Sequence, residues 1–220
     1  MCTPVGHSLG ALIIGTAMNR NQTWFPSFGV LLFYCFSAVA ADLDFLIGWY
    51  FGNINQYHHQ FSHSIVMAIL YGMLVYLAIL ICQKLWVSKV GSPGGSFHGE
   101  LQRSPSDVQS DSRFCALFYG SVGGFIYFGH LILDLLTVDQ AYPIGMQLFW
   151  PFSDAYVIAP LTPFPSVQHH AGGSNMLEFV KGILVSHNLR TVLMEVVILS
   201  PVYGLVLYLK PNYTRWNTRR

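Results

Sequence analysis

The chain has 220 residues, of which 53% are hydrophobic and only 10% are charged. Soluble domains carry about 25% charged residues, so this composition excludes an ordinary soluble domain and indicates an integral membrane protein. The formal net charge of +1 gives no basis for binding nucleic acid. The four cysteines are scattered, and they predict neither a disulfide framework nor a cysteine-based zinc site.

Apolar segments in chain order predict an all-α, polytopic membrane protein that forms a single integral membrane domain over residues 1–220. Its first helix, residues 6–18, is short, and Thr3-Pro4 is a start signal for it. About four longer segments have the length needed to cross roughly 30 Å of hydrocarbon. They are residues 28–47, 65–82, 114–136 and 192–209.

Two connections differ in composition. Residues 88–112 are rich in Ser, Gly and Pro, which predicts a flexible cytoplasmic linker. Residues 137–190 keep aromatic residues, prolines and short apolar pieces. We expect them to form a folded loop region on the outer membrane surface.

The basic residues orient the chain. If each helix crosses in turn, nine of the eleven Lys and Arg residues fall on one side and only Lys181 and Arg190 on the other. Positive charge gathers on the cytoplasmic side of membrane proteins. The chain is therefore expected to span the lipid bilayer with its beginning outside and its end inside.

The same threading brings seven ionisable side chains to the outer face, although they were not used to derive it. Imidazole and carboxylate groups are ligands for divalent metals such as zinc, and charges near hydrocarbon usually mark function. The predicted metal ligands are His7, Asp42, Asp44, His58, His63, His130 and Asp134.

The spacing of these residues supports the prediction to different degrees. His130 and Asp134 are four residues apart and share one helix face. Asp42 and Asp44 diverge by about 200° if their helix continues, so we expect at least one to reach the site. A structural His–Asp pair and a solvated helix end are the alternative interpretations.

The histidines near the third segment form a second group. His58, His59 and His63 lie within six residues, and Ser62 or Ser64 can cap the helix that follows. Taken alone, His7 is the weakest candidate, because a histidine at a helix start needs no ligand. The sequence assigns no role to His59, His169, His170, His187 and Glu195.

In this order, the pieces resemble the membrane-bound metal-dependent hydrolases, a family of inner-membrane-associated proteins. The similar pieces are Thr3–His7, Ala41–Asp44, His58–Ser64, His130–Thr137, Gly145 and Trp150–Ser153. His59 stands where the family pattern usually has Arg. The helical His130/Asp134 element is also similar to that of zinc-dependent phospholipases C and related single-strand nucleases, an analogy at the level of fold.

The resemblance implies an inner-membrane location and a metal hydrolase, without naming its substrate. We expect one or two divalent ions, zinc first, to activate water, with Asp42 or Asp44 as general base or bridging ligand. A site at this depth suits a lipid-like phosphoester or acyl substrate. Two alternatives stay open: a metal-ion or proton transporter, and a non-catalytic membrane scaffold with a structural metal.

Overall fold

The computed structural model describes residues 2–19, 26–51, 58–90, 105–138, 144–167 and 185–210. These parts are helical, and their only extended pairings are two isolated bridges. The helices are α1 (Pro4–Met18), α2 (Phe28–Val39), η1 (Ala41–Leu43), α3 (Asp44–Tyr50), η2 (Phe61–His63), α4 (Ile65–Val90), α5 (Pro105–Leu135) and α7 (Ser186–Leu209). The all-α prediction is confirmed.

The long helices have the length and composition of membrane spans. Three helices among the described residues qualify, and a fourth span results if the bent pair of α2 with η1 and α3 is counted as one. Along α4, large apolar side chains such as Leu74 and Ile81 are more than half exposed, as expected for a lipid-facing helix. By contrast, α1 has 15 residues and covers only about 22 Å.

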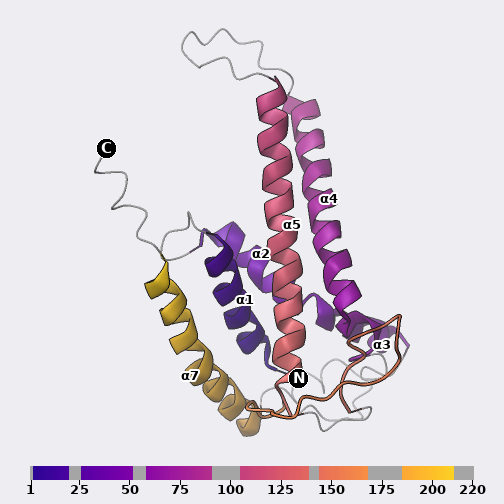
Figure 1. Ribbon diagram of the computed structural model, residues 1–220, viewed down its shortest axis with the longest axis vertical. Helices are drawn as coiled ribbons and strands as arrows, with labels where there is room; N and C mark the ends of the chain where they lie inside the picture. The colour runs from indigo at the N-terminus through magenta and orange to yellow at the C-terminus, as the bar shows by residue number, and fades with distance from the viewer. Residues whose placement is uncertain are drawn as a thin grey trace.

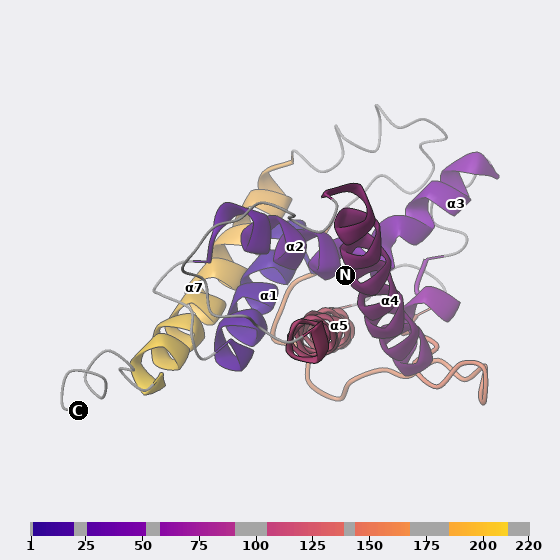
Figure 2. The same ribbon diagram turned by 90° about the horizontal axis from the view of Figure 1, so that it is seen from above.

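The central helix of the bundle is α5. It packs against α4 on one side and against α1 and α2 on the other, and α1 separates it from α7. Figure 2 shows the same arrangement from above. Buried Ala11, Tyr34 and Ile126 join α1, α2 and α5 in one apolar core. This packing brings the beginning of α1 and the last turn of α5 to the same end of the molecule (Figure 1).

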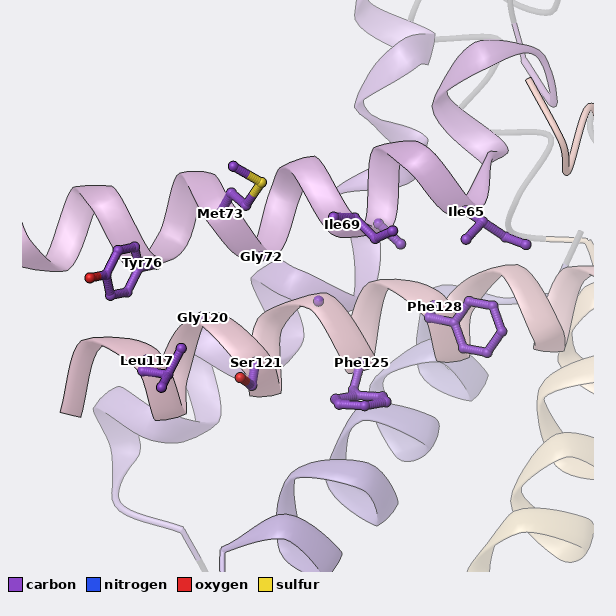
Figure 3. Close-up of a pocket in the computed structure, with 12 residues that line it drawn as sticks. Ile65, Ile69, Gly72, Met73, Tyr76, Leu117, Gly120, Ser121, Phe125 and Phe128 are labelled. Carbon is purple, nitrogen blue, oxygen red and sulfur yellow. The ribbon is translucent and has the colours of Figure 1, made fainter. Parts of the chain in front are cut away.

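Small residues allow α4 and α5 to approach closely. A Cβ atom on Gly72 would lie 2.9 Å from the carbonyl oxygen of Gly120, and a Cβ on Gly120 would lie 2.9 Å from the carbonyl oxygen of Gly72. Backbone approach of this kind is typical of membrane helix pairs. An apolar groove of about 430 Å³ runs along the contact (Figure 3).

The second span is not the continuous helix that the sequence predicted for residues 28–47. It breaks at Ala40, and the two parts meet at an angle of 59°. The short 3-10 turn of η1 carries Asp42, and α3 begins at Asp44. The divergence of about 200° assumed an unbroken helix, so it does not apply to Asp42 and Asp44 here.

The linker predicted at 88–112 was too wide. Its two ends are helical, since α4 continues to Val90 and α5 begins at Pro105. Once nucleated by an apolar span, a helix can continue through polar residues. The remainder, residues 91–104, lies outside the described residues.

Within the predicted loop region at 137–190, the structure describes residues 137–138 and 144–167, and the second of these ranges is here called the cap segment. The last residues of the predicted region instead belong to α7, which begins at Ser186. Backbone hydrogen bonds tie the cap segment to the rest of the protein. Leu148 accepts from the N–H of Ile65 at 3.0 Å, and Gln147 donates to the carbonyl of His59 at 3.1 Å. The segment therefore folds over the beginning of α4, at the lower end of Figure 1.

Candidate metal centre

All seven predicted ligands lie in one buried cluster at that end of the bundle. They come from four separate stretches of the chain, and the side chain of Asp42, the most accessible of them, is only 12% exposed. The cluster consists of His7 in α1, Asp42 in η1, Asp44 at the start of α3, His58, His63 in η2, and His130 and Asp134 in α5.

Local capping places two of these histidines. Thr3 is the N-cap of α1, its hydroxyl accepting from the N–H of Gly6 at 3.1 Å, so His7 falls in the first turns. Ser64 accepts from the N–H of Met67 at 3.3 Å and caps α4. The prediction that Ser64 could cap this helix is confirmed. His63 precedes the helix and belongs to the 3-10 turn η2.

Four of the residues, Asp42, His63, His130 and Asp134, form an inner group whose ligand atoms face one another. The Nε2 atoms of His63 and His130 are 3.2 Å apart. Asp42 Oδ1 lies 3.6 Å and 3.4 Å from these two nitrogens, and Asp134 Oδ2 lies 3.4 Å and 3.1 Å from them. Five distances between 3.1 and 3.6 Å thus relate four potential ligand atoms.

These separations fit a tetrahedral metal site. In a tetrahedron of imidazole and carboxylate ligands around zinc, neighbouring ligand atoms lie roughly 3.3–3.6 Å apart. Asp42 Oδ1 and Asp134 Oδ2 are buried without a hydrogen-bond donor among the described residues. Buried polar atoms usually have a partner, so the inner group has the donor set and the spacing to hold a cation.

The proton positions strengthen this inference for His130. Its Nδ1 lies 2.7 Å from the carbonyl oxygen of Ala38, which can only accept, so Nδ1 carries the proton. In the neutral ring, Nε2 then offers a lone pair to the inner group. Fixing the tautomer through the other ring nitrogen is the usual arrangement for a metal-bound histidine.

The same reasoning holds for His63. The hydroxyl of Ser62 donates to Asp44 Oδ2 at 2.6 Å, so it accepts from the Nδ1–H of His63 at 3.0 Å. The lone pairs of two Nε2 atoms and two carboxylate oxygens therefore converge on one place. Only a cation, either a proton or a metal ion, stabilises such a group away from water.

Asp44 lies behind the inner group rather than in it. Its carboxylate is 3.1 Å from the Nδ1 of His58 and 3.4 Å from the Nδ1 of His63. It therefore orients two imidazoles from the nitrogen that faces away from the centre. Carboxylates in this position fix metal-ligating histidines in many proteins.

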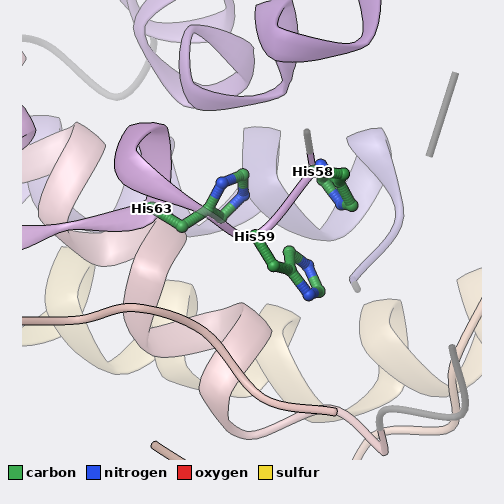
Figure 4. A group of neighbouring side chains, drawn as sticks. All are labelled: His58, His59 and His63. Carbon is green, nitrogen blue, oxygen red and sulfur yellow. The ribbon is translucent and has the colours of Figure 1, made fainter. Parts of the chain in front are cut away.

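His58, His59 and His63 form a second possible group, which shares His63 with the inner group (Figure 4). Burial, followed by the neighbouring His59, lowers the pKa of His58 to about 3, so this ring is neutral at physiological pH. Burial alone would lower the pKa of His63, but the carboxylates of Asp134, Asp42 and Asp44 raise it well above its ordinary value. The cluster is therefore a strong attractor of positive charge.

His7 completes the cluster from α1. Its ring stacks on that of His130 with centroids 3.8 Å apart, and its Nε2 is 3.3 Å from Asp134 Oδ1. Both of its ring nitrogens are buried without a hydrogen-bond partner among the described residues. The helix that the sequence left in most doubt thus delivers its histidine to the site.

Comparison with known proteins gives the family. A sequence model of the YdjM inner membrane protein family matches residues 1–213. The chain belongs to the YdjM inner membrane protein family. No curated protein and no solved structure matches it. Family membership and the apolar spans together make this YdjM family member an integral protein of the inner membrane.

Sequence reasoning about this YdjM family member missed several supporting groups. Ser62 orients His63, and the hydroxyl of Tyr127 donates to the carbonyl of Ser62 at 2.6 Å. The backbone N–H of Cys2 donates to Asp134 Oδ1 at 2.6 Å. The contacts of backbone groups cannot be predicted from residue types. Ser62, in contrast, was one of the two serines named as possible helix caps, so the sequence did draw attention to it.

The histidines to which the sequence assigned no role lie in different parts of the molecule. His59 joins the cluster, with its Nε2 3.9 Å from Asp134 Oδ2. His187 lies elsewhere, with its Nε2 3.0 Å from the carbonyl of Ser166. His169 and His170 fall outside the described residues.

Glu195 of this YdjM family member is fully buried in α7 and belongs to a separate network. Its Oε1 accepts from the N–H of Thr3 at 2.8 Å and from the thiol of Cys2 at 3.0 Å, and its Oε2 accepts from the Thr3 hydroxyl. Burial raises the pKa of the Cys2 thiol, which keeps it a donor. A Cβ on Gly6 would lie 2.6 Å from both Glu195 Oε2 and Cys2 Sγ, so this crossing of α1 and α7 requires glycine.

Proposed function

We propose that this protein is a metal-dependent hydrolase that cleaves a phosphoester at the membrane surface. The observation that carries the proposal is the inner group, in which two histidine Nε2 atoms and two carboxylate oxygens converge at separations of 3.1–3.6 Å. Asp42, His63, His130 and Asp134 would hold the ion, with zinc as the first candidate. His58 and His59, together with His63, form the second group, which lies close enough to serve a second ion.

A divalent ion at this place would take water as an additional, fifth ligand, lower the pKa of that water and polarise the phosphoryl oxygen of the substrate. The protein supplies the remaining steps. Asp42 has the most accessible carboxylate of the cluster. With Oδ1 on the ion, we assign its second oxygen, Oδ2, to take a proton from the attacking water. Asp44 is engaged by Ser62 and His58, so we assign it a positioning role.

The reaction is a simple hydrolysis. The water oxygen forms a new bond to phosphorus, and the bond from phosphorus to the leaving oxygen breaks. One proton of the water passes to the Asp42 carboxylate, which then gives this proton to the leaving oxygen, so that the leaving group becomes an alcohol and Asp42 is restored. No oxidant or second substrate is required.

We further propose that the cluster faces the non-cytoplasmic side. The cluster lies where α4 and α7 begin and α5 ends. Basic residues occupy the opposite ends of the same helices, at Lys84, Arg113 and Lys210. Among the basic residues that the structure describes, only Arg190 lies near the cluster end of α7. This distribution supports the orientation that the positive-inside rule predicts.

The test is hydrolysis of a chromogenic phosphodiester, bis(p-nitrophenyl) phosphate, by purified protein in detergent. We expect activity that is lost on chelation, restored by zinc, and reduced by at least about a hundredfold in Asp42→Asn, in line with the loss of a general base. Asp154→Asn changes an exposed carboxylate in the cap segment and should keep full activity.

Two results would overturn the proposal. One is metal-loaded protein without activity on the phosphodiester. The other is activity that survives both chelation and Asp42→Asn. A parallel assay with p-nitrophenyl butyrate separates phosphoester from acyl ester cleavage, because preference for the acyl ester would replace the substrate class while keeping the metal centre.

A further inference from the structure

A small pocket connects the cluster with the surface of the cap segment. It has a volume of about 180 Å³ and is lined by two members of the cluster region, His59 and Asp134. Its other walls come from the end of α5 and from the cap segment, including Thr137, Ile144 and Ala159. The pocket thus gives a route to Asp134, which is otherwise 4% exposed.

We propose that this pocket receives the phosphate headgroup of a membrane phospholipid, whose acyl chains stay in the bilayer. The proposal rests on the metal-dependent phosphoester hydrolysis proposed above and names its substrate class. It also assigns His59, which lines the pocket, as a residue that contacts the bound phosphate.

The charge of the pocket decides what can bind there. By itself, the Asp134 carboxylate would repel a phosphate. A divalent cation held by the inner group reverses the local charge and attracts an anion. The His59 imidazole, 3.9 Å from Asp134 Oδ2, then adds a second contact.

The backbone of His59 supports this assignment. Its φ of 63° is in the left-handed region, which non-glycine residues adopt rarely because it is strained. The hydrogen bond from Gln147 to its carbonyl holds this conformation. Such strain gathers at binding sites, where it fixes the direction of a side chain.

The size of the pocket argues for a headgroup rather than a whole lipid. Sites that enclose a drug-sized ligand have volumes of about 300–1,000 Å³, and this pocket is smaller than that range. It therefore accepts one end of a molecule, while the remainder stays outside.

The rim of the pocket indicates where that remainder lies. Ile144 and Ile158 line the pocket and are 47% and 60% exposed, and the nearby Leu161 is 71% exposed. Apolar side chains on a segment at the ends of membrane spans rest in the boundary between headgroups and acyl chains. A lipid can therefore reach the pocket without leaving the bilayer.

The larger groove between α4 and α5 is a different kind of surface. Figure 3 shows it beside Gly72 and Gly120, with Phe125 and Phe128 along α5. Its lining includes none of the cluster residues. It therefore provides no place for a headgroup, and it serves as the matched control.

The experiment compares phosphatidylglycerol in vesicles with a water-soluble diester of the same headgroup, glycerophosphoglycerol. For wild-type protein loaded with zinc, we expect kcat/KM for the vesicle lipid to be at least about tenfold higher, because the bilayer holds the headgroup at the rim. Ala159→Trp, which fills the pocket, should reduce hydrolysis of both substrates by at least about tenfold with unchanged metal content. Ile158→Asn should reduce only hydrolysis of the lipid. Ser121→Leu, in the α4–α5 groove, should change neither.

A second measurement does not depend on turnover. Retention of phosphatidylglycerol by purified, zinc-loaded protein after detergent exchange is measured by mass spectrometry, and it should fall in Ala159→Trp and in His59→Ala. Equal hydrolysis of the soluble diester and the lipid, or retention unaffected by Ala159→Trp, would overturn the lipid assignment and leave the hydrolase standing. Lipid retention that depends on Ala159 without hydrolysis of any phosphoester would overturn the hydrolase and keep the pocket.

Discussion

Two buried polar regions lie side by side in this membrane protein, and they differ in how their atoms are satisfied. In the Glu195 network, both carboxylate oxygens accept hydrogen bonds from Thr3 or Cys2. In the inner group, Asp42 Oδ1 and Asp134 Oδ2 have no hydrogen-bond donor within the described part of the chain, and they face two imidazole nitrogens. The N–H of Cys2 joins the two regions through Asp134 Oδ1.

This difference separates a structural network, around Glu195, from a candidate binding site, the inner group. A satisfied carboxylate in a membrane span holds helices together, because breaking its hydrogen bonds in hydrocarbon is costly. A group of converging acceptors stabilises the fold only when a cation lies between them, because their lone pairs otherwise repel one another. Burial and charge alone, which Glu195 and Asp134 share, would not have separated the two roles.

Removing the metal should produce the largest effect. Because the inner group repels itself without a cation, we expect chelation to lower the thermal unfolding temperature strongly. A ligand present at a thousand times its Kd stabilises by about 4 kcal/mol. Thermal unfolding with and without chelator measures this, and an unchanged unfolding temperature would count against a bound metal.

Glu195→Ala should produce the second largest effect, and it should lower stability without removing the metal. It leaves the N–H and hydroxyl of Thr3 buried without an acceptor, and each such group costs about 1–3 kcal/mol. We expect a lower free energy of unfolding but full metal stoichiometry, measured by denaturation and elemental analysis. Glu195→Gln, which keeps an acceptor, should lose less stability. Loss of the metal in Glu195→Ala would show that the two regions are one site.

Asp44→Asn should weaken the centre without removing it. The carboxylate orients His58 and His63 through their Nδ1 atoms, and loss of such a partner lowers metal affinity by about 10–100-fold. Competition with a chromophoric chelator measures the affinity. Asp154→Asn is the matched control, and equal affinities in the two variants would remove the positioning role.

The smallest effect is expected in the cap segment. Gly145 has a φ of +93°, and a Cβ at this position would lie 2.6 Å from the carbonyl oxygen of Val157. Gly145→Ala should therefore destabilise the protein by about 1 kcal/mol or more. Gly204→Ala, in α7 where a Cβ meets no atom within 4 Å, is the control and should not destabilise. Equal unfolding temperatures would show that the cap segment tolerates the side chain.

Much of the arrangement could be predicted from the sequence. Apolar length gave the spans, and the bias of Lys and Arg placed the seven ionisable residues at one end of them. Their meeting in one cluster follows from that placement, because helix ends on one membrane face lie close together. The helical spacing of His130 and Asp134 was sufficient to predict that both reach the same centre.

Other features needed the tertiary structure. The break at Ala40 has no glycine or proline to announce it, yet it turns both Asp42 and Asp44 toward the histidines. The role of Asp44 behind the centre depends on which imidazole nitrogen it meets. Spacing along the chain contains no information about either.

The central claim is that Asp42, His63, His130 and Asp134 hold a divalent metal ion. The most direct test is the metal content of purified protein by inductively coupled plasma mass spectrometry, for wild type, His130→Ala and the control His187→Ala. We predict at least one ion per chain in wild type and in His187→Ala, and loss of that ion in His130→Ala. Wild-type protein without stoichiometric metal, or the same content in all three proteins, would contradict the claim.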